Sequence, residues 1–252
     1  ETVNLSSLVG STVSSVNDLS DALIEDDSIY LGNNPASTTS TAEYNLGLGV
    51  TALSAITTGD YNTAVGYKSL TLNTSGSYNT AFGSSALQSN TTGEANTAFG
   101  YLSLGSNSTG RFNSAIGYRA LNSNLSGEAN IAIGHEALFS NTTGDFNIGI
   151  GNTNLQLNTT GYENTMIGFE AGRSTSTGYR NTALGYEGLE LNTTGYRNTS
   201  IGNKGLNKNS TGYDNIAVGF QGLNSNTTGF KNTAAGNSAL ATNTTGSQNT
   251  AL

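Results

Sequence analysis

Few residues in this chain of 252 could carry out chemistry. It has one histidine, His135, no cysteine and no tryptophan, and only 10% of its residues are charged. No carboxylates recur in a paired phase that would supply a general acid and a general base. Aspartate is also too sporadic for the calcium-binding rolls that need one in every repeat. We therefore expect no catalysis, no cofactor and no metal ion, and we expect His135 to be a surface residue.

Asparagine in the sequon Asn-x-Ser/Thr is the most frequent group that could be modified. Glycosylation would place a row of glycans on one edge of the protein. Local turn chemistry is the alternative: Asn and hydroxyl side chains bond to nearby backbone, and the following glycine closes the turn. Turn chemistry explains the regular spacing without a glycan, and we favour it. Ten of the sequons lie at one phase of this regular spacing, and they begin at Asn73, Asn90, Asn107, Asn124, Asn141, Asn158, Asn192, Asn209, Asn226 and Asn243.

Aromatic residues next to basic ones are the best candidates for binding. Five aromatic residues recur 17 residues apart, and Arg180 and Arg197 directly follow two of them. An aromatic stripe edged with arginine suits contacts with sugars or other polymers, whereas packing of these rings between chains is the alternative. The five are Tyr162, Tyr179, Tyr196, Tyr213 and Phe230.

In earlier repeats the aromatic residue lies one position later. A shift of one residue in an extended segment turns a side chain to the opposite face. We therefore expect the two halves of the protein to present different surfaces. The earlier aromatics are Tyr61, Tyr78, Phe112 and Phe146.

A repeat of 17 residues positions all of these side chains. One asparagine recurs thirteen times from Asn45 to Asn249 without an insertion, which gives twelve full repeats and a partial one. A fixed period of this length predicts a solenoid. The members between the first and last are Asn62, Asn79, Asn96, Asn113, Asn130, Asn147, Asn164, Asn181, Asn198, Asn215 and Asn232.

Numbering this asparagine as position 1 shows what each repeat keeps. Glycine fills positions 5 and 15 of all twelve repeats, with Gly66, Gly83 and Gly100 as examples of position 5. Position 14 is always Ser or Thr, position 4 is always apolar, and position 9 is Leu in eleven repeats. The exception at position 9, Gly172, lies in the most irregular repeat, where we expect a local packing change rather than a site.

The two glycines predict two turns in each repeat, because glycine allows positive φ. Two short segments lie between the turns, and we expect both to be strands that pair in parallel with the next repeat. Positions 4 and 9 would then supply the large interior residues, and the asparagines would form side-chain ladders. The predicted fold is an all-β parallel β-roll, a β-solenoid with 17-residue coils. Its thin interior favours several chains packed side by side.

Three stretches carry the pattern most clearly: Asn62–Leu70 (NTAVGYKSL), Asn113–Leu121 (NSAIGYRAL) and Asn181–Leu189 (NTALGYEGL). They resemble the coil repeat of trimeric β-roll adhesins, which are the heads of trimeric autotransporters and related shafts of bacteriophage tail fibres. The resemblance covers residues 45–252, although the usual coil of that family is shorter than 17. It implies a left-handed roll, a homotrimer and a role in attachment at an extracellular or virion surface.

Two further segments precede the roll. Residues 1–31 predict a helical, coiled-coil or extended leader, because Leu5, Val9, Val16, Leu19 and Leu23 fit a loose heptad. Residues 32–44 form a linker or collar. Residues 1–44 contain seven acids and no base, and no region has the basic footprint that nucleic-acid binding needs. No apolar run is long enough to insert into a membrane as a helix.

The expected function is that of a structural, adhesive fibre, such as a phage tail-fibre or extracellular adhesin shaft. Its partners would be further copies of itself and a cell-surface receptor, for which a glycan is one candidate. A subunit that polymerises end to end into an extracellular filament is the first alternative. An ice-binding β-solenoid is the second, because Ser and Thr recur at positions 13 and 14.

Overall fold

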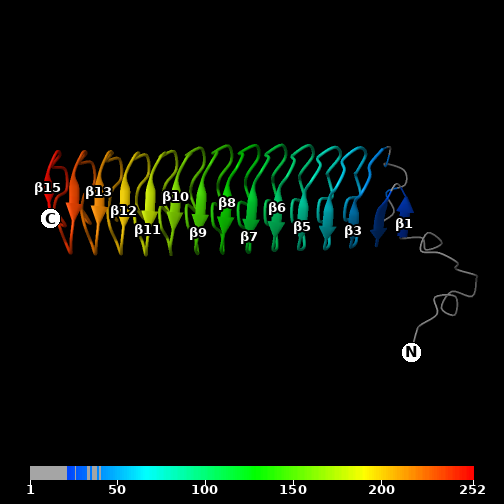
Figure 1. Ribbon diagram of the computed structural model, residues 1–252, viewed down its shortest axis with the longest axis horizontal. Coiled ribbons are helices and arrows are strands. Elements are labelled where there is room, and N and C mark those ends of the chain that lie inside the picture. The colour runs from blue at the N-terminus through cyan, green and yellow to red at the C-terminus, as the bar shows by residue number, and fades with distance from the viewer. Residues whose placement is uncertain (1–21, 26, 33–34, 36–38, 40) are drawn as a thin grey trace, which may run out of the picture.

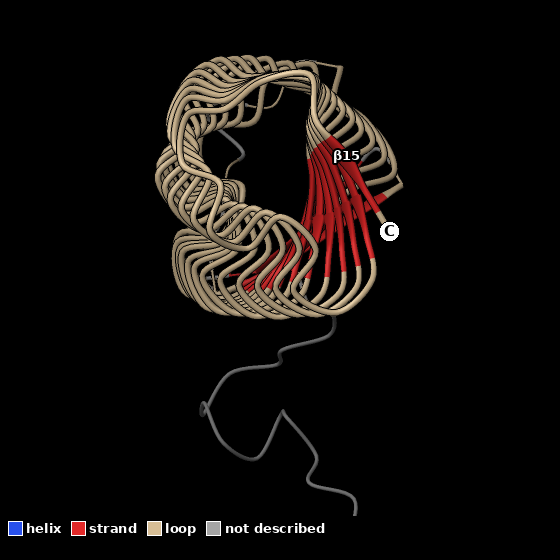
Figure 2. Ribbon diagram, turned by 90° about the vertical axis from the view of Figure 1, so that its left-hand side faces the viewer, coloured by secondary structure: helices blue, strands red, loops and turns tan. Residues whose placement is uncertain are grey.

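The computed structural model describes residues 22–25, 27–32, 35, 39 and 41–252. These residues form a rod of stacked coils, and the strands of successive coils join in one 15-stranded sheet that follows chain order (Figure 1). Viewed along the rod, the coils superpose and all the strands lie on one side (Figure 2). The predicted parallel β-solenoid with 17-residue coils is confirmed.

The sheet begins with an antiparallel hairpin of β1 (Ala22–Glu25) and β2 (Ser28–Leu31). Every later pair is parallel and joins equivalent residues of neighbouring coils, as where Thr63 lies opposite Thr80. The later strands are β3 (Leu46–Leu48), β4 (Thr63–Val65), β5 (Thr80–Phe82), β6 (Thr97–Phe99), β7 (Ser114–Ile116), β8 (Ile131–Ile133), β9 (Ile148–Ile150), β10 (Thr165–Ile167), β11 (Thr182–Leu184), β12 (Thr199–Ile201), β13 (Ile216–Val218), β14 (Thr233–Ala235) and β15 (Thr250–Ala251).

Each coil has one strand, so the prediction of two was wrong. The segment expected to be the second strand contains left-handed residues at positions 7 and 9, such as Lys68 (φ 57°) and Leu70 (φ 48°). Alternation between left-handed and other conformations prevents an extended strand. The segment still bonds to the next coil, because the Leu70 amide donates to the Ala86 carbonyl at 3.0 Å.

The prediction that the residue at position 4 points into the interior was also wrong. The residue at position 3, in the middle of the strand, points inward and is small in every coil except the one with Met166, as Ala64 and Ala81 show. Position 4 points outward, because side chains alternate along a strand, and Phe82 and Ile116 are each 44% exposed. The interior of each coil is filled instead by position 3, by the leucine at position 9 and by asparagine.

Two buried rows of asparagine run along the interior. The Nδ2 group of Asn62, at position 1, donates to Asn45 Oδ1 at 3.0 Å and to the Gly76 carbonyl at 2.9 Å. Asn73, at position 12 of the same coil, donates to the same Gly76 carbonyl at 2.8 Å. The Gly76 carbonyl, at position 15, therefore ties both rows together, and the predicted position-1 ladder is confirmed along the chain.

Glycine is required at position 15 by the closeness of the next coil. A Cβ atom added to Gly93 would lie 2.5 Å from the Gly110 carbonyl oxygen. Glycine at position 5 is required for a second reason, because Gly66 adopts φ 132°, which other residues rarely adopt. These two constraints explain why neither glycine varies among the full repeats.

Where the structure describes the N-terminal leader, its backbone is extended, which is one of the alternatives that the sequence left open. Residues 22–31 contain the β1–β2 hairpin rather than a helix, and residues 1–21 of the predicted coiled coil lie outside the described residues. Tyr30 in β2 is fully buried at this end of the rod. A Cβ on Gly47, where most coils have alanine, would lie 3.0 Å from the Tyr30 ring. The first coil therefore has glycine at position 3 because Tyr30 occupies the space.

The irregular coil is a packing change, as predicted. Met166 replaces the usual small residue at position 3 and is fully buried, whereas Gly172 replaces the leucine at position 9. A Cβ on Gly172 would lie 2.9 Å from the Met166 sulfur. Methionine therefore fills from the strand the volume that leucine fills elsewhere from the turn.

The same coil interrupts the asparagine row at position 12. Thr175 stands there, and both its hydroxyl and the Oδ1 atom of Asn158 are buried without a hydrogen-bond partner. On the other side, Asn192 Nδ2 donates to the Gly195 carbonyl at 3.1 Å. The backbone is unchanged, because the Thr175 amide bonds to the residue three before it at 2.9 Å, as the Asn158 amide does at 3.0 Å.

Thr175→Asn is expected to stabilise the rod. The new amide would donate to Asn158 Oδ1 and accept from Asn192, removing buried unsatisfied atoms that cost about 1–3 kcal/mol. Chemical denaturation followed by circular dichroism should show a higher midpoint. Thr160→Asn, at an exposed position 14 of the preceding coil, is the matched control and should leave the midpoint unchanged. A lower midpoint for Thr175→Asn would contradict the ladder.

Candidate functional site

The predicted aromatic stripe forms a continuous stack of rings at position 16. The centroids of Tyr162 and Tyr179 are 4.9 Å apart with 5° between their planes, and those of Tyr179 and Tyr196 are 5.0 Å apart with 2° between them. Tyr213 and Phe230 continue the stack at 4.9 Å steps. The spacing follows from the parallel register of the coils, which brings equivalent residues about 4.8 Å apart.

This stacking decides what the row can offer a ligand. The inner rings, Tyr179, Tyr196 and Tyr213, each have an aromatic neighbour on both faces. Along these inner rings a ligand therefore meets ring edges and hydroxyl groups, not ring faces. Sugars that stack on aromatic rings need the faces, so the row suits edge contacts or packing against another chain.

The arginines beside this row are paired with acids of neighbouring coils. Arg180 Nε lies 2.7 Å from Glu163 Oε2, and Arg197 Nε lies 2.8 Å from Asp214 Oδ1. The hydrogen bond and charge of Glu163 raise the pKa of Arg180. Arg197 also lies over the Tyr196 ring, 5.0 Å from its centroid. The local charge is therefore nearly balanced, and the row has no strong preference for anions.

The earlier aromatics, at position 17, point outward like those at position 16. Tyr61, Tyr78, Phe112 and Phe146 are 50–62% exposed, whereas Tyr179 is only partly exposed. The prediction that the one-residue shift would turn these side chains to opposite faces was wrong. The segment is not extended, because position 17 is left-handed, as at Phe112 (φ 59°). The two halves of the rod differ instead in how far their rings protrude.

A third set of aromatics lies at position 6. Tyr101, Tyr118 and His135 stack in sequence with centroids 5.6 and 5.3 Å apart. His135 is exposed, which agrees with its prediction as a surface residue. Its ring continues a short aromatic row, and no coil has a carboxylate at position 6.

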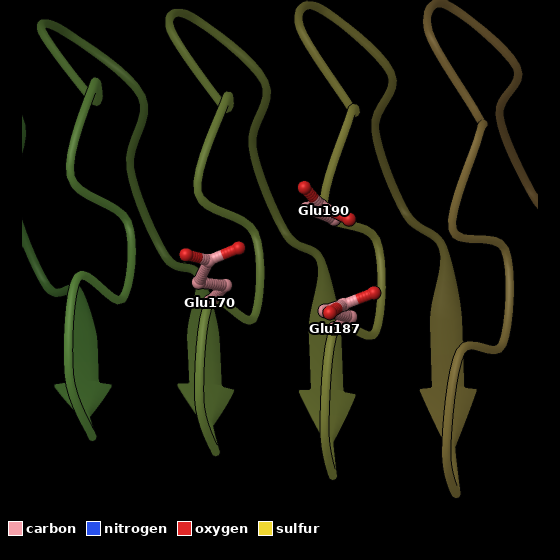
Figure 3. Close-up of side chains that lie close together, drawn as sticks. All are labelled: Glu170, Glu187 and Glu190. Atoms are coloured by element: carbon pink, nitrogen blue, oxygen red, sulfur yellow. The ribbon is translucent and has the colours of Figure 1, made fainter.

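The structure brings together three carboxylates that the sequence analysis missed. Glu170 and Glu187 occupy position 7 of successive coils, and Glu190 occupies position 10 (Figure 3). One oxygen of each lies within 4.8 Å of the others. The repeat could have indicated this cluster, because Glu170 and Glu187 are 17 residues apart and therefore occupy the same position in successive coils.

Neighbouring side chains already bond to two of these three carboxylates. Lys204 Nζ lies 3.1 Å from Glu187 Oε2, and Asn207 Nδ2 donates to Glu190 Oε2 at 2.9 Å. Burial opposes the ionisation of Glu187, but hydrogen bonds from Tyr186 and Lys204 outweigh it and lower its pKa. Because Glu187 and Glu190 are already bonded to Lys204 and Asn207, we assign no metal ion to the cluster.

No protein-family model, curated protein or solved structure matches this chain. In the part of the chain that the structure describes, no helix is long and apolar enough to cross a membrane. The resemblance to adhesin and tail-fibre repeats therefore stays a prediction, and function must be argued from the surfaces of the rod.

The buried sequons allow a direct test of the glycan alternative. Asn107 and Asn124 are fully buried, and Asn124 Nδ2 donates to Asn107 Oδ1 at 2.8 Å. A glycan on either nitrogen would break the row and could not fit inside the coil. Folded protein from a glycosylating host is expected to carry these two asparagines unmodified, and peptide mapping by mass spectrometry after peptide N-glycosidase treatment should find neither of them converted to aspartate. A folded rod with glycans at interior sequons would contradict the structure.

Proposed function

We propose that this chain is the shaft of a structural and adhesive fibre, of the kind found in phage tail fibres and extracellular adhesins. It acts as a homotrimer at an extracellular or virion surface and attaches to a cell-surface receptor, for which a glycan is the candidate. The observation that carries this proposal is the outer face of the sheet, which has no charged residue at position 2 or 4 from β3 to β15.

The outer strand face has an apolar row at position 4 along its length, beside a position-2 row that is mostly Thr or Ser. Position 4 is Leu, Val, Phe, Ile or Ala in every coil, and its side chains include Phe99, Leu184 and Ile201, which are exposed. The Phe82 and Phe99 rings stack at 4.9 Å. Thirteen strands at about 4.8 Å make this face about 60 Å long. A continuous uncharged face of this kind marks an interaction surface rather than scattered apolar residues.

Further copies of the chain are the partners that fit this face best. Each rod presents the same row at the same spacing, so rods in register can interdigitate their side chains along the whole length. Three rods around a common axis would bury one face each in closed cyclic symmetry. The interior of each coil is already filled by its own residues, so the proposed trimer concerns the outer strand face and not the core.

An ice-binding rod is the second candidate, and one observation favours it. Position 14 is Ser or Thr and exposed in all twelve full coils, which gives a straight row of hydroxyl-bearing residues. The hydroxyls at position 13 are used differently, because Thr74 Oγ1 donates to the Thr91 carbonyl at 3.1 Å. A single exposed row is a narrow surface for ice, so this candidate ranks below the fibre.

Light scattering of the whole chain tests the fibre, and we expect a discrete mass of three chains. The double variant Ile116→Lys and Ile201→Lys places charges on the outer strand face and should shift the protein toward single chains. Circular dichroism should be unchanged, because both residues are exposed.

The matched control is Thr143→Lys with Thr194→Lys, which adds the same charges at position 14. It should keep the mass of three chains, and a thermal-hysteresis assay on the same two proteins tests ice binding. A wild-type protein that stays a single chain at all concentrations would contradict the trimer. Filaments that lengthen with concentration would favour the end-to-end polymer.

A further inference from the structure

We propose that two notches in the position-17 row each bind one terminal, neutral pyranose ring. The walls of the notches are the rings of Tyr78, Phe112 and Phe146, and their floors are Ala95 and Ala129. This inference deepens the proposed attachment function and rests on it, because it names where on the rod a sugar would bind and which class of sugar it would be.

The notches arise from an alternation in the sequence. Along five successive coils, position 17 reads Tyr78, Ala95, Phe112, Ala129 and Phe146. Each alanine leaves a gap of one coil between two rings. Both faces of Phe112 therefore look into gaps, whereas both faces of Tyr61 are covered by stacked tyrosines at 4.8 and 5.2 Å.

The exposed fractions of the position-17 rings agree with open ring faces beside the notches. Tyr78 is 62% exposed and Phe112 and Phe146 are 61% exposed, against 50% for Tyr61 in its stack. The electron-rich face of an aromatic ring attracts the slightly positive C–H groups of a sugar, and dispersion adds to the attraction. The position-17 rings beside the notches therefore have open faces, whereas the inner rings of the position-16 row are stacked on both faces.

The width of a notch suits a puckered ring better than a flat one. Walls two coils apart are separated by about 9.6 Å, twice the parallel strand spacing. A flat aromatic ring stacked between them at contact distances of about 3.5–4.0 Å on each side would need only about 7–8 Å. A pyranose chair, which carries hydrogens on both faces, is thicker and fills the remaining space.

Polar side chains beside the notches can bond to sugar hydroxyls. Glu94 precedes Ala95, and its carbonyl accepts from the Phe112 amide at 3.1 Å, which fixes the floor of the first notch against its wall. Arg111 Nη1 lies 3.9 Å from Glu94 Oε2, and both side chains are nearly half exposed. Such a long, hydrated ion pair is weak, so both groups can turn toward a ligand.

The second notch has the same construction with a different charge. Glu128 precedes Ala129, its carbonyl accepts from the Phe146 amide at 3.0 Å, and its own amide donates to Asp145 Oδ1 at 2.8 Å. Across both notches position 16 carries three acids and one base. This negative balance repels carboxylated and sulfated sugars, so the ligand class is neutral.

The backbone allows a variant that closes the notches without disturbing the fold. Ala95 and Ala129 both have φ 53°, close to the 56° of Tyr61 and the 59° of Phe112. An aromatic residue at either alanine would therefore adopt a conformation that the row already uses. Ala95→Phe with Ala129→Phe should extend the stack from Tyr44 to Phe146.

The experiment is binding of the whole chain to an array of immobilised oligosaccharides, some ending in glucose, galactose or N-acetylglucosamine and some sialylated. We expect wild type to bind neutral ends and not sialylated ones. The filled variant Ala95→Phe with Ala129→Phe should lose at least tenfold in affinity, and Phe112→Ala, which removes the wall shared by both notches, should do the same. Tyr196→Phe, which leaves the closed stack closed, should bind like wild type.

Equal binding by wild type and the filled variant would overturn the notches while leaving attachment through another surface intact. Failure of wild type to bind any neutral sugar, or preference for sialylated ends, would also overturn them. The proposed homotrimeric fibre is tested separately, by the mass in solution, and none of these substitutions should change that mass. Circular dichroism of each variant confirms that the rod has formed.

Discussion

The structure depends on one carbonyl group in each coil. In ten of the twelve full coils the oxygen of the glycine at position 15 accepts from two asparagine side chains, as Gly110 does from Asn96 at 2.8 Å and Asn107 at 3.1 Å. Those asparagines bond in turn to the coil before. Moving either asparagine by one residue would leave buried polar atoms without partners. We infer that this constraint holds the period at 17 through twelve full repeats.

The same bonds offset an unusual backbone. Positions 7, 9 and 17 are left-handed in nearly every coil although most of these residues are not glycine, as at Leu121 (φ 52°). Such conformations cost roughly 1–2 kcal/mol per residue. Buried leucine, inter-coil hydrogen bonds and the asparagine rows offset that free-energy cost only when coils stack. The outward positions remain free to vary, so surface rows can differ from one stretch of the rod to the next.

The sequence predicted what the period alone determines: the solenoid, the coil boundaries, the invariant glycines and the asparagine ladder. It did not predict features that depend on backbone dihedrals. Leu70 was predicted to lie in a strand because a leucine in the sequence does not indicate a left-handed φ. The apolar residue at position 4 was placed inside because alanine at position 3 is too inconspicuous to identify as core. Open and closed aromatic rows became distinguishable only once the register placed Ala95 and Ala129 between rings.

Hydrogen exchange of asparagine side-chain amides, measured by nuclear magnetic resonance, tests the central claim most directly. The account predicts that the Nδ2 protons of Asn96, Asn107 and Asn113, all fully buried, exchange as slowly as backbone amides of the strands. Those of Asn152 and Asn237, which are exposed, should exchange at once. Rapid exchange of the interior asparagines in a folded rod would contradict the account.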